Sequence, residues 1–254
     1  MKLKKLLAAL ALLLTAPLAS ADIVSYTFLA NGQTEGVAQQ GSAVFSFDTN
    51  NLGWLQITLT DNVSPTAKTA SELDGLLFSF SDPLGALTLQ SVSPQAVLDC
   101  SGDHAIPCDP YAGVAPALYG WGAQSSGDDA SLGAGFTGSG YAYHPYAVIN
   151  SNYALPATGD GNLANGSHNP FLVGPVTFTF QTDLASIPDV TSVQFLFGTN
   201  PDSQSGTCTS DQCGDVGPCT DGLCASVPEP HTLALIGVAL SAFGWGARRK
   251  LYNA

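Results

Sequence analysis

Short segments in the middle of the chain alternate apolar and polar residues with a period of two. The alternation is clearest over residues 55–60 and 176–181, where Leu, Ile, Val or Phe occupies every second position. This period places the apolar side chains on one face of a β-strand. Weaker segments of the same kind, separated by turns that contain Gly, Pro, Asn or Asp, are residues 23–29, 43–48, 76–80, 86–92 and 190–197. No segment of the body has a helical period, so we expect an all-β fold, an antiparallel β-sandwich with jelly-roll or Greek-key connections.

The stretch from residue 99 to residue 170 differs in composition, because Gly, Asn and Tyr occur throughout it. We expect long loops there, interrupted by short strands. Loops of that length are uncommon in compact domains unless they are functional or cross-linked. Aromatic rings on such loops can stack on sugar rings, or they can pack the loops onto the sandwich. The candidate glycan-binding residues are Trp121, Tyr141, Tyr143 and Tyr146.

The charge of the body is strongly negative. Between Asp22 and Val227 there are nineteen acidic residues and one basic residue, Lys68, which leaves a net charge of −18. A field of that sign repels phosphate backbones and anionic lipids, so we exclude nucleic acid as a partner. No calcium-loop pattern occurs in the chain, and we expect no metal and no cofactor.

The first 21 residues have the parts of a secretory signal peptide. A start with three lysines is followed by an apolar run over residues 6–14. Ala19 and Ala21 then supply the small-x-small pattern that signal peptidase recognises. We expect export and cleavage before Asp22. Because the residue at the cleavage point is not Cys, lipid attachment in the manner of a bacterial lipoprotein is not expected.

The chain contains six cysteines. An even number in an exported protein indicates disulfides, and the sequence leaves their connectivity open. A zinc site of four thiols is the alternative, but the oxidising compartment and the gaps of four and five residues argue against it. We expect disulfides among Cys100, Cys108, Cys208, Cys213, Cys219 and Cys224, the last four in a Cys-rich linker over residues 201–226.

The C-terminal tail, residues 227–254, combines three features. Pro228, Glu229 and Pro230 precede an uncharged stretch over residues 232–247, and three consecutive basic residues end the pattern. Sixteen helical residues span roughly 24 Å, which can cross a bilayer that thins locally. The basic residues should remain in the cytoplasm, which leaves the body on the outer side of the inner membrane. We therefore expect a single transmembrane helix over residues 232–247.

This tail resembles the PEP-CTERM sorting domain of Gram-negative bacteria. The resemblance implies recognition by exosortase, a membrane enzyme similar to a transpeptidase, through Pro228, Glu229 and Pro230 together with Arg248 and Arg249. It also implies removal of the segment after the motif. Carriers of the domain are associated with exopolysaccharide and with the matrix of biofilms or flocs. The resemblance covers the tail alone and says nothing about the body.

The body shows no pattern typical of an enzyme. His104, His144 and His168 could form a hydrolytic site only if the fold brought them close to a carboxylate. No HExxH, GxSxG or phosphate-binding glycine motif occurs. We therefore expect a non-enzymatic structural or adhesive protein, first held at the inner membrane and then sorted to the cell surface or the extracellular matrix. A glycan-binding module and a secreted hydrolase are the alternatives.

The expected organisation has four parts. A signal peptide, residues 1–21, precedes a β-sandwich body over residues 22–200, and the linker and the sorting tail follow. Signal peptidase and exosortase are the expected processing partners, and exopolysaccharide is a possible partner of the body.

Overall fold

The structure is a computed structural model, and it describes residues 23–101, 108–134, 145–154, 163–164, 166–198 and 202–213. In this part of the chain the regular secondary structure is β-strand, apart from two short 3-10 helices, η1 (Thr69–Ser71) and η2 (Ala117–Gly120). The predicted all-β fold is confirmed. The strands are β1 (Ile23–Thr34), β2 (Val37–Asp48), β3 (Asn51–Asp61), β4 (Leu73–Phe80), β5 (Leu87–Ser93), β6 (Ala96–Asp99), β7 (Asp109–Pro110), β8 (Trp121–Ser126), β9 (Asp129–Ala134), β10 (Val148–Ile149), β11 (Phe171–Val173), β12 (Val176–Thr182), β13 (Val190–Phe197), β14 (Asp202–Ser205) and β15 (Thr207–Cys208).

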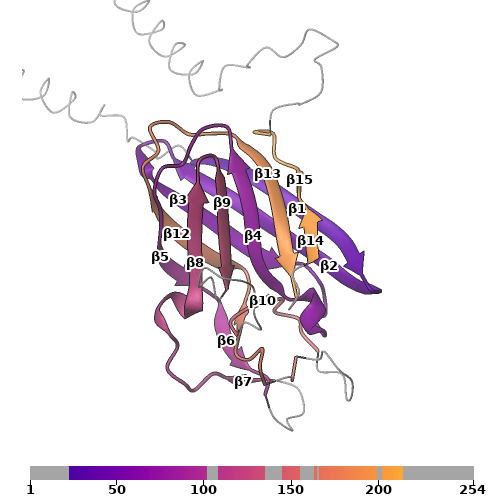
Figure 1. The fold of residues 1–254 in the computed structure, drawn as a ribbon. Coiled ribbons are helices and arrows are strands. Elements are labelled where there is room, and N and C mark those ends of the chain that lie inside the picture. The colour runs from indigo at the N-terminus through magenta and orange to yellow at the C-terminus, as the bar shows by residue number, and fades with distance from the viewer. Residues whose placement is uncertain are drawn as a thin grey trace, which may run out of the picture. The chain divides into compact units, whose positions relative to one another are not determined.

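The strands form two sheets. The first has the order β15-β1-β2-β3-β12-β5, and all its neighbouring strands are antiparallel. The second follows the path β14-β13-β4-β10-β11-β6-β7. Strand β13 pairs along the whole of β4, so β9 and β10 share the other edge of β4, and β8 extends the sheet beyond β9. Figure 1 shows β8, β9, β4 and β13 in front of the first sheet.

The two sheets pack face to face through phenylalanine side chains. Phe45 and Phe47 on β2 face Phe78 and Phe80 on β4, and none of the four is more than 2% exposed. Their rings meet edge to face, with centroids 5.2 Å apart for Phe45 and Phe78 and 6.0 Å apart for Phe47 and Phe80. Such pairs add to the free energy gained by burying the rings. The core therefore lies between β2 and β4 and their neighbours.

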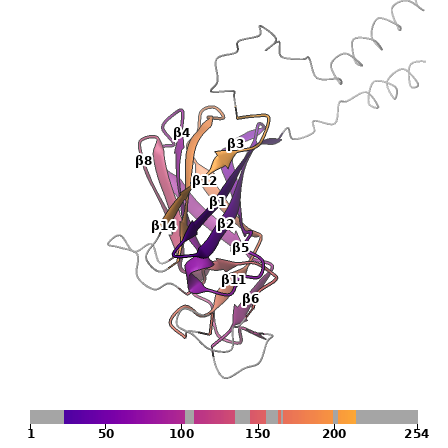
Figure 2. The same ribbon diagram turned by 90° about the vertical axis from the view of Figure 1, so that its right-hand side faces the viewer.

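A smaller apolar cluster lies beside β6, β10 and β11. It contains Ile149, Phe171 and Val173 together with the buried disulfide between Cys100 and Cys108. The strands of this region lie at the end of the sandwich opposite β15, as the two views show (Figures 1 and 2). We call this the loop end. The disulfide closes the segment between β6 and β7.

The strand predictions are confirmed at every segment named from the alternation. Residues 55–60 lie within β3 and residues 176–181 within β12, and the five weaker segments lie on β1, β2, β4, β5 and β13. Short strands also interrupt the stretch from residue 99 to residue 170, as expected. One of the pairs that the structure describes, β10 with β11, is parallel, which departs from the expected antiparallel arrangement. The jelly-roll or Greek-key connection remains a prediction.

The predicted boundary at residue 200 is wrong. Strand β14 pairs with β13 and strand β15 pairs with β1, so residues 202–208 belong to the two sheets and not to a linker. Both segments are short and polar, and their strand structure depends on the long strand that each one joins. Linker residues after residue 213 lie outside the described part of the chain.

The two processing segments predicted from the sequence also lie outside the described residues. These are the signal peptide over residues 1–21, with its cleavage residues Ala19, Ala21 and Asp22, and the tail over residues 227–254. Among the described residues, no helix has both the length and the apolar character needed to cross a bilayer. The predicted transmembrane segment, residues 232–247, is not among them.

Candidate functional site

Trp121 lies at the start of β8 and points into the core. Its side chain is 4% exposed, and its ring centroid lies 4.5 Å from that of Phe178. Its Nε1–H donates a hydrogen bond of 2.9 Å to the carbonyl oxygen of Tyr146, the kind of partner that a buried indole requires. No face of the ring is available to a sugar, so the prediction that Trp121 binds glycan is wrong.

Tyr146 is buried as well. It is 6% exposed, and its ring centroid lies 6.2 Å from that of Tyr111 and 5.8 Å from that of Tyr119. Burial, with a hydrogen bond to Tyr111, raises the pKa of Tyr146 to about 12. The prediction of a sugar-stacking role is therefore wrong for Tyr146 too, because its ring packs the loop onto the sandwich. Tyr141 and Tyr143 lie outside the described residues.

His168 meets a carboxylate that the sequence did not suggest. Its Nδ1 lies 2.8 Å from Oε1 of Glu72, which follows η1. Both side chains are buried, at 2% and 1% exposure. Burial lowers the pKa of His168, which favours the neutral imidazole. His104 and His144 lie outside the described residues.

Glu72 belongs to a group of three buried carboxyls at the loop end. Burial raises the pKa of Glu72 well above its usual range, and the charge of Asp61 raises it further. Burial and then the charge of Glu72 raise the pKa of Asp74 in the same way. Within the described residues, Oε2 of Glu72 and Oδ2 of Asp74 have no hydrogen-bond partner. The neutral acid is therefore the favoured form of both side chains.

Both carboxylate oxygens of Asp61, at the end of β3, have hydrogen-bond partners. Its Oδ2 accepts a hydrogen bond of 2.6 Å from the hydroxyl of Thr66, and its Oδ1 accepts one of 2.9 Å from the backbone N–H of Val63. Burial nevertheless raises the pKa of Asp61 to about 7. In the part of the chain that the structure describes, no group of three or more His, Cys, Asp or Glu side chains is placed to hold a metal ion. The three carboxyls form a buried acidic cluster.

The outer face of the second sheet carries an open groove of about 400 Å³ over β4, β8, β9 and β13. Its side chains come from two rows that run across the strands. The first row is Ser126, Asp129, Ser79 and Ser192, and the second row is Gln124, Ser131, Leu77 and Gln194. Within the first row, Ser192 Oγ lies 3.0 Å from Ser79 Oγ, and Ser79 donates a hydrogen bond of 2.6 Å to Asp129.

Sequence reasoning did not find the groove. The outward positions of β8 and β9 include Ser, Gln and Asp. Without a strong alternation of apolar residues beside them, these residue types indicate a loop and not a strand. The one available signal was Gly127 with Asp128, a turn pair between two segments of similar length. Gly127 has a φ of +68°, which glycine adopts without strain.

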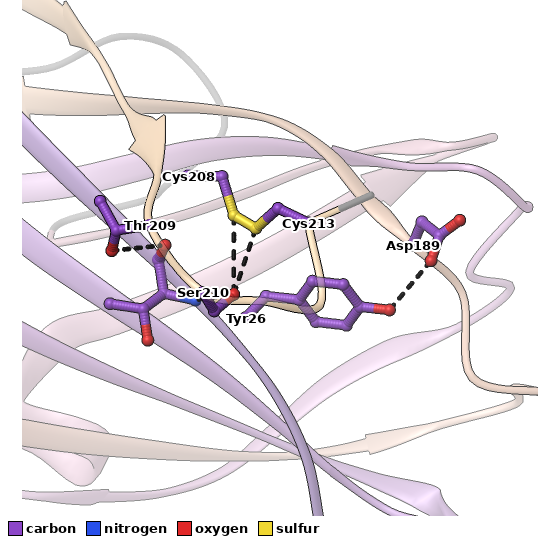
Figure 3. Close-up of a disulfide and its surroundings, with 7 residues drawn as sticks. Tyr26, Asp189, Cys208, Thr209, Ser210 and Cys213 are labelled. Carbon is purple, nitrogen blue, oxygen red and sulfur yellow. Dashed lines mark hydrogen bonds between the residues drawn. A yellow bond between two sulfur atoms is a disulfide. The ribbon is translucent and has the colours of Figure 1, made fainter. Parts of the chain in front are cut away.

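The last described segment is held against β1 by a disulfide-closed loop (Figure 3). Cys208 and Cys213 form the disulfide, and the hydroxyl oxygen of Ser210 lies 3.6 Å and 3.2 Å from their sulfur atoms. The backbone N–H of Thr209 donates to the carbonyl oxygen of Thr27 at 2.8 Å. The predicted disulfides are confirmed for Cys100, Cys108, Cys208 and Cys213, whereas Cys219 and Cys224 lie outside the described residues.

The same region of β1 is joined to the second sheet by a buried tyrosine. The hydroxyl of Tyr26 donates a hydrogen bond of 3.0 Å to Asp189, just before β13 (Figure 3). Burial, and then the contact with Asp189, raise the pKa of Tyr26 to about 12. The disulfide loop is therefore attached to a strand that is itself linked to both sheets.

Comparison with known proteins identifies the tail and not the sandwich. A family model described as the PEP-CTERM protein-sorting motif matches residues 226–250. No curated protein and no solved structure matches the chain. The matched range includes the predicted motif residues Pro228, Glu229, Pro230, Arg248 and Arg249. The C-terminal tail of this chain, residues 226–250, is a PEP-CTERM protein-sorting motif.

Proposed function

We propose that the chain is an exported protein, processed by exosortase, that acts as a non-enzymatic structural or adhesive component of the cell surface or extracellular matrix. The observation that carries this proposal is the PEP-CTERM protein-sorting motif at residues 226–250. A sorting motif of this kind marks an exported protein for processing by exosortase. The role in the matrix goes beyond the motif and is supported by properties of the body.

The covalent chemistry of the body suits an extracytoplasmic location. Two disulfides, Cys100–Cys108 and Cys208–Cys213, occur in the described residues. Structural disulfides persist in oxidising compartments and are rare in the reducing cytosol. A net charge of −18 between Asp22 and Val227 also favours a protein that stays soluble outside the cell.

The geometry of the body is compatible with processing at both ends. Thr27 and Thr209 are hydrogen-bonded, so the chain leaves the described sandwich beside the strand with which it enters. The buried residues of the main core cluster come mainly from the two sheets, and all of them lie between Tyr26 and Phe197. Removal of a signal peptide before Asp22, and of the segment after the sorting motif, therefore leaves this core intact.

The test is the final location of the protein when the motif is changed. In cells that contain exosortase, the wild-type chain should accumulate at the surface or in the matrix fraction. Glu229→Gln should instead accumulate in the inner-membrane fraction, and so should the wild-type chain in cells that lack exosortase. Glu35→Gln, in the exposed turn between β1 and β2, is the matched control and should behave as wild type. Equal release of the wild-type and Glu229→Gln chains would contradict the proposal.

A further inference from the structure

The groove on the second sheet combines a hollow with a polar lining that carries little charge. Asp129 is the single charged residue among the eight positions of the two rows, and most of the others are Ser or Gln. Short side chains in the middle of the face leave the hollow unfilled. Its volume of about 400 Å³ is within the range typical of small-molecule sites.

The hydrogen bonds of the first row determine which groups remain for a ligand. Ser79 donates its proton to Asp129, and the hydroxyl of Ser192 is paired with that of Ser79. A carboxylate carries acceptor sites on two oxygens, and one Ser79 proton leaves most of them open. The first row therefore mainly accepts hydrogen bonds. The amides of Gln124 and Gln194 in the second row both donate and accept.

The charge of the groove excludes anionic ligands. Lys68 is the only lysine or arginine in the described part of the chain, and it is not among the residues that line the groove. A phosphate, sulfate or uronate group placed here would meet Asp129 with no cation to balance it. A neutral ligand rich in hydroxyl groups avoids this cost and offers the donors that the first row needs.

The position of the groove argues against a peptide that adds a strand. Such peptides bind at a free sheet edge through backbone hydrogen bonds. Strand β4 pairs with β13 on one side and with β9 on the other, and β9 also pairs with β8. The backbone edges of β4 and β9 are therefore already paired, whereas β8 has β9 as its one strand partner among the described residues. A strand added to the other edge of β8 would extend the sheet beside the groove, so recognition within the groove must come from the side chains of the two rows.

We propose that the groove over β4, β8, β9 and β13 binds a neutral polysaccharide, with Gln124, Gln194 and Asp129 as its main hydrogen-bonding residues. Apolar contact with the ligand comes from Leu77 in the second row. This inference deepens the adhesive role and rests on the proposed function for the setting in which the protein meets a polysaccharide. The site is separate from the aromatic rings Trp121 and Tyr146, which are buried.

The test uses the exported protein, purified in its oxidised form, in affinity gels that contain a neutral polysaccharide. Galactomannan, mixed-linkage β-glucan and dextran serve as neutral probes, and polygalacturonate serves as the anionic probe. At least one neutral probe should retard the wild-type protein, and polygalacturonate should not. The double variant Gln124→Ala/Gln194→Ala should bind about tenfold more weakly or worse, because two side-chain hydrogen bonds are lost.

The matched control removes two exposed glutamines from the other sheet. Gln56 on β3 and Gln181 on β12 lie on neighbouring strands and are exposed, so Gln56→Ala/Gln181→Ala should leave binding unchanged. Equal unfolding midpoints of the two double variants would show that both fold. Retardation by no neutral probe, a preference for polygalacturonate, displacement by peptides and not by sugars, or equal losses in both double variants would each overturn the proposal. Correct sorting without binding would reject the groove and leave the proposed function standing.

Discussion

At the scale of single residues, Trp121 has a structural role because side chains along β8 point alternately into the core and toward solvent. Trp121 occupies an inward position of the strand, and Gln124 occupies an outward one. The residue type alone could not show this, because an aromatic ring in a Gly- and Tyr-rich stretch is equally compatible with stacking on a ligand and with packing. The side of the sheet depends on strand register, which comes from the pairing of β8 with β9.

The role of Trp121 can be tested by its contribution to stability. Trp121→Ala should lower the free energy of unfolding by about 3–5 kcal/mol, because a large buried ring is lost. Trp121→Phe should cost less, about 1–3 kcal/mol, because it mainly leaves the carbonyl oxygen of Tyr146 unpaired. Trp54 on β3 is 40% exposed, and Trp54→Phe should change stability by less than about 0.5 kcal/mol. Denaturant unfolding with intact disulfides measures the free energy of unfolding of all three variants. Equal losses of stability for Trp121→Phe and Trp54→Phe would contradict the structure.

The buried carboxyls represent a second feature that residue type could not reveal. Asp74 stands within the apolar run of β4, and Glu72 directly precedes that strand. Carboxyl side chains are usually exposed, so a sequence-based reading places both at the surface. Their burial depends on two elements. The 3-10 helix η1 is too short to predict from the sequence, and the segment that carries His168 is distant from Glu72 in the sequence.

These carboxyls predict that stability falls as the pH rises. The pKa of Asp61 is raised to about 7, and those of Glu72 and Asp74 are also raised. Near pH 4 and above, the unfolded chain loses protons that the folded chain keeps, so the free energy of unfolding decreases until the folded groups ionise. The lowered pKa of His168 has the opposite sign, because the unfolded imidazole gains a proton below about pH 6.5. Three carboxyls outweigh one imidazole, and the protein should be more stable at pH 5 than at pH 8.

Glu72→Gln isolates this effect. The amide keeps a hydrogen-bonding group near Nδ1 of His168 and removes one ionisable group. We expect the variant to be more stable than wild type at pH 8, because the folded protein no longer holds a carboxyl whose pKa is raised, and to have a flatter stability profile between pH 5 and 8. Glu35→Gln, in an exposed turn, should leave the profile unchanged. A steeper profile for Glu72→Gln would contradict the assignment of a neutral buried acid.

At the scale of elements, strands whose inward and outward residues differ strongly could be predicted from the sequence. Strands β3 and β12 alternate Leu, Ile, Val or Phe with Gln and Thr, and both were predicted at the right place. Strands β14 and β15 could not, because Asp-Ser-Gln-Ser and Thr-Cys carry no apolar periodicity. They are edge strands whose structure depends on a longer neighbour.

The disulfide between Cys208 and Cys213 should stabilise the structure near it and not the whole sandwich. Replacing both cysteines with Ser removes a short closed loop, for which the chain-entropy model gives about 2 kcal/mol. The hydrogen bond from the backbone N–H of Thr209 to Thr27 should then open more often. Hydrogen exchange should become faster at Thr209, while the amides of β2 and β3 in the core should keep their protection. An equal loss of protection in β2 would show that the loop supports the whole fold and not the chain end alone.

At the scale of the whole molecule, an acidic body separates two basic ends. The body between Asp22 and Val227 has a single lysine, and the remaining basic residues are grouped at the two ends of the chain. These groups are the expected flanks of membrane-directed segments, whereas the body carries the disulfides of an exported domain. The sorting motif at residues 226–250 was recognisable from its residues because it is a local pattern, whereas the groove depends on four strands from separate parts of the sequence.

The most direct test of this account is the intact mass of the mature protein, measured before and after reduction. We expect a chain that begins at Asp22, lacks the uncharged segment after the sorting motif, and gains the hydrogens of at least the Cys100–Cys108 and Cys208–Cys213 bridges on reduction. A mature protein that retains residues 1–21 and the complete tail, with a mass that reduction does not change, would contradict the account.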